Sequence, residues 1–145
     1  MIRISVQAAP IDLAAELEHA ELAGAGAVAT FTGLVRADDA VELLELEHYP
    51  GSTEAALRAL AEQATQRWEL LAATVVHRVG PMRPGERIVF VATAAPHRAA
   101  ALEACAFLID RLKTQAPFWK RETRGGVARW VEARESDDAA AERWG

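Results

Sequence analysis

A buried strand followed by a long helix, between residues 88 and 117, constrains the fold more than any other part of the sequence. Residues 88–93 form a nearly continuous apolar run, which is typical of a central strand. After Pro96, apolar side chains recur at helical spacing, and the helix must end just before Pro117 because proline disfavours helix in the residue that precedes it. This strand and helix indicate a layered fold in which helices cover a sheet.

The rest of the chain alternates between strand-like and helix-like segments. Alternating apolar residues predict strands, and apolar residues three and four positions apart predict helices. We expect strands at residues 2–6, 27–35, 41–48, 74–78, 88–93, 118–122 and 127–131, and helices capped by Asp12, capped by Ser52, and beginning after Pro96. Gly80-Pro81 and Pro84-Gly85 are expected to bracket a loop. Without a linker or repeat, residues 1–145 are predicted to form one α+β domain with a mixed or antiparallel sheet packed against helices.

Composition and charge exclude several classes of protein. With 51% hydrophobic and 26% charged residues, the chain resembles an ordinary folded globule. Its net charge of −5 argues against a broad basic face for nucleic acid, and no apolar run reaches the roughly 20 residues of a membrane helix. The single cysteine, Cys105, cannot form an internal disulfide, and its apolar neighbours indicate a buried side chain. With no signal peptide visible, we expect a cytoplasmic protein that binds neither nucleic acid nor membrane.

Basic side chains gather where the predicted elements end. Arg36 follows a strand, His97 and Arg98 begin the long helix, and Lys113 and Lys120 lie around its end. A helix N-terminus favours anions, so His97 and Arg98 could hold a phosphate, although a surface pair without function is an equal alternative. Either lysine taken alone is more often structural. The segment from 113 to 122, however, contains two large aromatics and four charges, and the whole pattern favours a pocket for a small anion.

The length of the long helix separates two of these clusters. If it is unbroken from Arg98 to Lys113, their Cα atoms lie about 22 Å apart at about 1.5 Å per residue. That distance is too long for one small substrate to span. We therefore expect a pocket across a two-fold interface, with His97 and Arg98 of one chain facing Lys113 and Lys120 of its mate.

Six motifs, in order over nearly the whole chain, resemble the large, catalytic subunit of molybdopterin synthase. They are Phe31-Thr32-Gly33-Leu34-Val35-Arg36, Leu46-Glu47-His48-Tyr49, His77-Arg78-Val79-Gly80, Pro84-Gly85-Glu86, His97-Arg98, and Leu112-Lys113 through Phe118-Trp119-Lys120-Arg121-Glu122. No single motif is decisive, but six in register make a chance match improbable. The resemblance implies an α/β hammerhead-type fold.

The same resemblance implies a reaction and its partners. Two large subunits form a homodimer, and a small ubiquitin-like sulfur carrier docks on each to give a heterotetramer. The Gly-Gly C-terminus of the small subunit carries a thiocarboxylate, and two sulfur transfers convert a cyclic pyranopterin monophosphate (precursor Z) into molybdopterin during molybdenum cofactor biosynthesis. Fixed cations suit this chemistry because donor, acceptor and transition state are all anionic.

Residue roles follow from the same resemblance. Lys113 and Lys120 are implied to be catalytic, with Lys113 as the principal acid/base or electrostatic group and Lys120 as its partner. The substrate site is implied to comprise Leu34, Val35, Arg36, His97, Arg98, Arg121 and Glu122, together with the two lysines. Arg134 could also reach the pocket. Cys105 is not expected to carry the sulfur.

Other functions are open to the same residues. A noncatalytic dimeric module could bind a phosphorylated metabolite through these cations, and an acyl or sulfuryl transferase could use a lysine nucleophile on a small thioester. Turnover with a thiocarboxylated partner would distinguish the synthase from the noncatalytic module. A lysine adduct formed without any partner protein would favour the transferase. His19, His48 and His77 lack paired metal-ligand spacing, so we predict packing or capping roles, no metal and no cofactor.

Overall fold

The computed structural model describes residues 1–37, 40–131, 142 and 144. The strands are β1 (Ile2–Gln7), β2 (Ala27–Leu34), β3 (Leu43–His48), β4 (Ala72–Arg78), β5 (Gly80–Met82), β6 (Arg87–Ala95), β7 (Phe118–Arg124) and β8 (Val127–Val131). The helices are α1 (Leu13–Glu21), α2 (Ser52–Trp68) and α3 (Arg98–Gln115). The predicted α+β fold is therefore confirmed.

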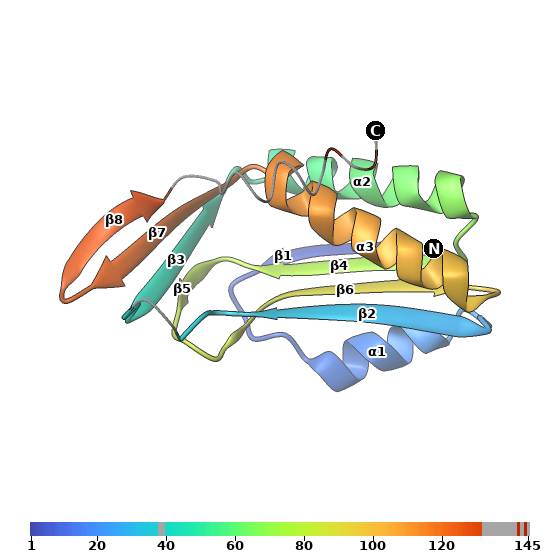
Figure 1. The fold of residues 1–145 in the computed structure, drawn as a ribbon, viewed down its shortest axis with the longest axis horizontal. Helices are drawn as coiled ribbons and strands as arrows, with labels where there is room; N and C mark the ends of the chain where they lie inside the picture. Colours follow the sequence, from blue (N-terminus) through green and yellow to red (C-terminus); the bar gives the residue numbers. More distant parts are fainter. Residues whose placement is uncertain (38–39, 132–141, 143, 145) are drawn as a thin grey trace.

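The first sheet has the strand order β1-β4-β6-β2, with helices on both faces (Figure 1). β1 runs parallel to β4, and β6 runs antiparallel to β4 and β2. On one face, Val91 packs in an apolar cluster with Leu57 of α2 and Leu108 of α3. On the other face, Val76 and Phe90 pack in a cluster near α1. Apolar burial on both faces makes this sheet the centre of the core.

The second sheet has the order β5-β3-β7-β8, is antiparallel throughout, and extends from one end of the first (Figure 1). We call the side of this sheet that carries Leu44 and Leu46 its inner face. These two leucines are 5% exposed and cluster with Val35, which follows β2, and with Met82 of β5. This small cluster joins the second sheet to the first.

Two local expectations were wrong. Residues 80–82, expected within a loop, form β5. They form a strand because β3 offers them a partner, with Leu46 opposite Gly80 and Leu44 opposite Met82. Gly51, rather than Ser52, caps α2: its φ of +83° suits glycine, and its N–H donates to Oε1 of Glu54 at 3.0 Å. Among the helices of the described residues, none is long and apolar enough to cross a membrane.

Candidate active site

Lys120 and Glu122 lie on the inner face of the second sheet. Residues directly opposite in an antiparallel pair share a face, and these two lie opposite the buried Leu46 and Leu44. Nζ of Lys120 is 3.5 Å from Oε1 of Glu122, and Nη2 of Arg124 is 2.8 Å from Oε2 of the same carboxylate. The Glu122 side chain is 13% exposed and that of Lys120 is 39% exposed. The carboxylate thus orients a lysine that still reaches solvent.

Arg121 projects from the opposite face of β7. It lies directly across from Glu45 of β3, and its Nη2 is 2.8 Å from Oε2 of that residue. The hydrogen bond that the guanidinium donates to Glu45 raises the pKa of Arg121, and the guanidinium also lies 5.5 Å from the ring centroid of Trp130. The structure does not bring Arg121 together with Lys120 on one face.

Lys113 lies in the last turn of α3, close to the connection that leads into β7. The N–H of Ala116 donates to the carbonyl oxygen of Leu112 at 3.3 Å. Oγ1 of the buried Thr53, in α2, donates to the carbonyl oxygen of Pro117 at 3.1 Å. These bonds fix the end of α3 and the start of β7 relative to α2, while the Lys113 side chain is exposed.

A buried histidine lies at the same connection. His77 of β4 is 5% exposed, and its ring stacks on Phe118, the first residue of β7, with centroids 4.0 Å apart and planes at 24°. The pKa of His77 is lowered to about 4, chiefly by burial, and the positive charges of Lys113 and His48 also act to lower it. Lys113 therefore lies within electrostatic reach of the residue that contacts the start of β7.

The segment from Leu34 to Arg36 reaches the same end of the molecule. Val35 is 4% exposed and packs in the cluster that contains Leu46, which is the cross-strand neighbour of Lys120. Its N–H donates to the carbonyl oxygen of Glu86 at 2.9 Å. Leu34 is 56% exposed, and Arg36 is exposed. Val35 thus anchors the segment, and its two neighbours face solvent near the second sheet.

His97 and Arg98 lie at the other end of α3. His97 occupies the N-cap position without a side-chain capping bond, and both side chains are exposed. The helix is continuous from Arg98 to Gln115, so the expected separation of about 22 Å between Arg98 and Lys113 holds at about 1.5 Å per residue. One chain does not bring these clusters together. Arg134 lies outside the described residues.

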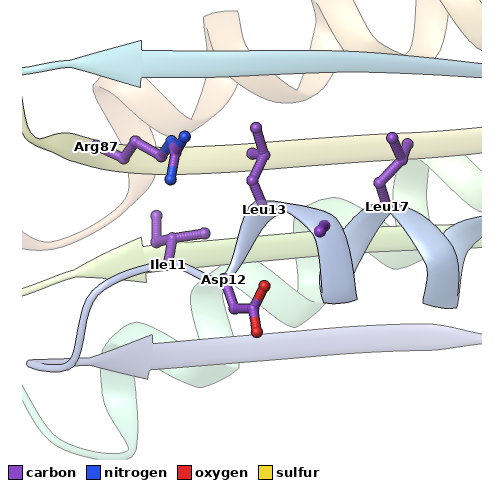
Figure 2. Close-up of a pocket in the computed structure, with 6 residues that line it drawn as sticks. Ile11, Asp12, Leu13, Leu17 and Arg87 are labelled. Atoms are coloured by element: carbon purple, nitrogen blue, oxygen red, sulfur yellow. The ribbon is translucent and has the colours of Figure 1, made fainter.

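A hollow of about 400 Å³ lies elsewhere, beside the start of α1 (Figure 2). Its lining residues are Ile11, Asp12, Leu13, Ala14, Leu17 and Arg87. None of the predicted site residues is among them. The hollow is open and combines an apolar helix face with one charge of each sign, so nothing about it suits two anionic reactants.

The chain resembles known proteins over most of its length. The family model described as MoaE protein matches residues 6–115, well over half of the chain. The chain belongs to the MoaE family. A molybdopterin synthase catalytic subunit from Cereibacter sphaeroides is 53% identical, over 99% of this chain and 100% of its own length. The resemblance that the six sequence motifs indicated is confirmed.

Solved structures agree with this membership of the MoaE family. The molybdopterin biosynthesis MoaE protein from Burkholderia ambifaria is 48% identical, with a TM-score of 0.86 over 99% of this chain and 98% of that one. A complex of subunits 1 and 2 of molybdopterin-converting factor from Helicobacter pylori contains a chain with a TM-score of 0.76 over 92% of this chain and 91% of that one. At 23% identity, that second likeness shows the fold alone.

Two features of this MoaE chain were missed by sequence reasoning. It has only two lysines, Lys113 and Lys120, among sixteen lysines and arginines in total, and a simple count of residue types would have found this. Arginine stays protonated in proteins, whereas lysine can lose its proton, so this distribution singles out the two residues. The second feature is the contact between His77 and Phe118. Sequence reasoning predicted packing for His77 but had no means of finding its partner.

Proposed function

We propose that this chain acts as the catalytic subunit of a molybdopterin synthase and that sulfur transfer occurs where the end of α3 meets β7. Its relatives with about 50% identity are catalytic subunits of that enzyme, which supports the sulfurtransferase activity. One observation carries the choice of site: the only two lysines of the chain lie on either side of this one connection. The substrate is a cyclic pyranopterin monophosphate, and two sulfurs are added to form the dithiolene of molybdopterin.

The two lysines have different settings, and we assign them different roles. Lys113 is exposed on α3 and serves as the principal acid/base or electrostatic group. Lys120 is its partner and is oriented by Glu122 at 3.5 Å. A carboxylate is poorly suited to contact a phosphate or a thiocarboxylate directly, so Glu122 acts on the substrate site through Lys120.

The remaining cations complete the binding site. Arg36 approaches from the end of β2, where Val35 anchors the segment. Arg121 bonds Glu45 on the opposite face, and we assign it to the outer wall of the site rather than to contact with the phosphate.

A second copy of the chain supplies the missing enclosure in this proposal. In one chain both lysines reach solvent, and His97 and Arg98 lie at the far end of an 18-residue helix. A two-fold dimer that places the α3 N-terminus of one copy against the α3 C-terminus of the other would bring both clusters around one small anion. Excluding water from such a pocket strengthens the attraction between cations and anionic reactants.

The sulfur donor in this proposal is a small ubiquitin-like subunit with a Gly-Gly C-terminus. The relatives with about 50% identity are named catalytic subunits, a name that implies a further subunit and so supports a two-component enzyme. The extended C-terminus would bring its thiocarboxylate to the lysines, and one small subunit on each large subunit gives a heterotetramer. We place the reaction in the cytoplasm, where a buried thiol such as Cys105 remains reduced.

A turnover assay tests the enzyme function. The purified chain is mixed with thiocarboxylated small subunit and the cyclic pterin monophosphate, and the dithiolene product is measured by mass spectrometry. We expect product to form only when all three are present. Binding of the pterin without product would favour a noncatalytic module. A lysine adduct formed from a small thioester without the partner would favour the alternative transferase.

Mixed dimers test whether the site is shared. Lys113→Ala and Arg98→Ala chains are each expected to be inactive as homodimers. In a mixed dimer, one of the two pockets would combine wild-type Lys113 with wild-type Arg98. We expect about half of the wild-type activity, and no recovery in verified mixed dimers would contradict a shared site.

A further inference from the structure

His77 is a buried titratable side chain with no role in the chemistry proposed above. It lies near the end of β4, in the first sheet, whereas its ring partner Phe118 begins β7, in the second. Its Nδ1 is 2.9 Å from the carbonyl oxygen of Arg78. Because a carbonyl oxygen only accepts, Nδ1 carries the proton in this contact. The ring orientation is therefore fixed by a backbone bond on its own strand and by an aromatic face on the other sheet.

We propose that His77 is a positioning residue for the sulfur-transfer reaction, because its stacking on Phe118 fixes the start of β7 and so sets the placement of Lys120 relative to Lys113. This inference rests on the proposed function of the two lysines. It assigns His77 no contact with either substrate.

The position of Phe118 determines where Lys120 lies relative to Lys113. Side chains alternate along a strand, so Phe118 and Lys120 share the inner face of β7 two positions apart. Lys113 lies five residues before Phe118, at the end of α3. Pro117 is held from α2 by Thr53, and Phe118 is held from the first sheet by His77. A shift of Phe118 would therefore move Lys120 while leaving Lys113 in place.

The setting also explains why this position suits a neutral ring. Burial lowers the pKa of His77 to about 4, so the imidazole is uncharged at neutral pH. The titratable side chains that act on it electrostatically are those of Lys113 in α3 and His48 in β3. A permanently charged cation at position 77 would repel Lys113, whereas a neutral ring packs flat against Phe118 and leaves the lysine near the site.

Two substitutions separate the effect of stacking on Phe118 from the effect of the hydrogen bond to the Arg78 carbonyl. His77→Phe keeps an aromatic face for Phe118 but loses the bond to the Arg78 carbonyl, and His77→Gln keeps a donor but loses the ring. Val76→Ala is the matched control, because Val76 is the neighbouring fully buried residue of β4 and packs on the α1 side of the sheet. All three variants are compared with wild type for kcat, for the KM of each substrate, and for unfolding midpoint.

The expected result is a selective loss of turnover. In His77→Gln, kcat should fall about 10- to 100-fold, since a misplacement on the order of 1 Å can cost about 100-fold. KM should change less than about twofold, because the binding cations remain. His77→Phe should keep kcat within about threefold, and Val76→Ala should unfold more easily with kcat unchanged. Equal kcat in His77→Gln and wild type, or an equal fall in Val76→Ala, would overturn the proposal.

Spectroscopy gives a readout that does not depend on activity. Because the chain has two lysines, a sample labelled at lysine Cε gives two side-chain NMR signals. His77→Gln should move the Lys120 signal, and Val76→Ala should leave it unchanged. If wild type gave no turnover, the proposed function would fail, while the lysine signals would still decide whether His77 positions Lys120. An unmoved Lys120 signal in His77→Gln would refute the positioning role in either case.

Discussion

The two sheets of this protein differ in how deeply their residues are buried and in how many charged side chains they carry. All seven residues of β4 are buried, and helices cover both faces of the first sheet. In the second sheet, four of the five residues of β8 are exposed, and β7 carries a ladder of charge pairs. Its outer face exposes Trp119 and Trp130, with ring centroids 5.8 Å apart. The first sheet supplies stability, and the second keeps side chains accessible.

The two lysines that we propose as the reactive groups lie where these two regions meet. Lys113 belongs to a helix packed on the first sheet, and Lys120 belongs to the second sheet. A site at such a boundary gains rigidity from one region and accessibility from the other. This division of roles predicts that substitutions will affect stability and activity separately, according to the sheet in which they fall.

A core truncation in the first sheet should have the largest effect. Phe90 is 1% exposed and packs near α1 with Val76. Phe90→Ala removes a large buried ring and leaves a cavity, so the free energy of unfolding should fall by about 3–5 kcal/mol. Urea denaturation followed by far-UV circular dichroism measures this loss. A loss below about 1 kcal/mol would contradict the view that this sheet supplies most of the stability.

Acid should weaken the contact between the two sheets. Unfolded His77 takes up a proton below about pH 6.5, whereas folded His77 does so only near its lowered pKa of about 4. Between these values the unfolded state binds more protons, so stability falls as pH falls, by about 3 kcal/mol in total from this residue. The free energy of unfolding of wild type and of His77→Phe is measured from pH 7 to pH 4, and the difference between them gives the contribution of His77. If the free energies of unfolding of the two proteins fell in parallel with pH, His77 would not be held neutral in the folded state.

Removing either lysine should affect activity and spare stability. Lys113→Ala is expected to lower kcat by at least about 100-fold, in the range of a lost acid/base group. Its side chain is exposed, so the unfolding midpoint should hardly change. Lys113→Arg restores the charge but not the ability to give up a proton, so it separates these two roles. Turnover within about twofold of wild type in Lys113→Ala would remove the lysine from the mechanism.

Much of the fold was predictable because local pattern and burial agree in the first sheet. The apolar run at 88–93 became the centre of β6, and Pro96 and Pro117 bound α3 as expected. The division into two sheets was not predictable, because strand partners are set by contacts distant in sequence. The short β5 had no strand signal of its own and forms because β3 offers it a partner.

The candidate site was predictable in its residue types and less so in its geometry. Lys120 and the end of β2 both lie beside the apolar cluster of the second sheet, and Lys113 lies in the last turn of the helix that precedes β7. Strand alternation placed Arg121 on the opposite face from Lys120, which single-strand reasoning left open. That Glu122 lines the substrate site stays a prediction, and its pairing with Lys120 and Arg124 was not foreseen from the sequence.

The smallest expected effect comes from truncating an aromatic side chain of the second sheet. Trp130 is 54% exposed, and among the described residues it contacts the edge-on Trp119 ring and the Arg121 guanidinium. Little apolar area is removed from water here, so Trp130→Ala should lower the free energy of unfolding by about 1 kcal/mol, the size of one aromatic pair. The same urea titration measures it beside Phe90→Ala. If both truncations cost the same, the second sheet would be as well packed as the first, and its exposed aromatics would need a covering surface to explain their stability.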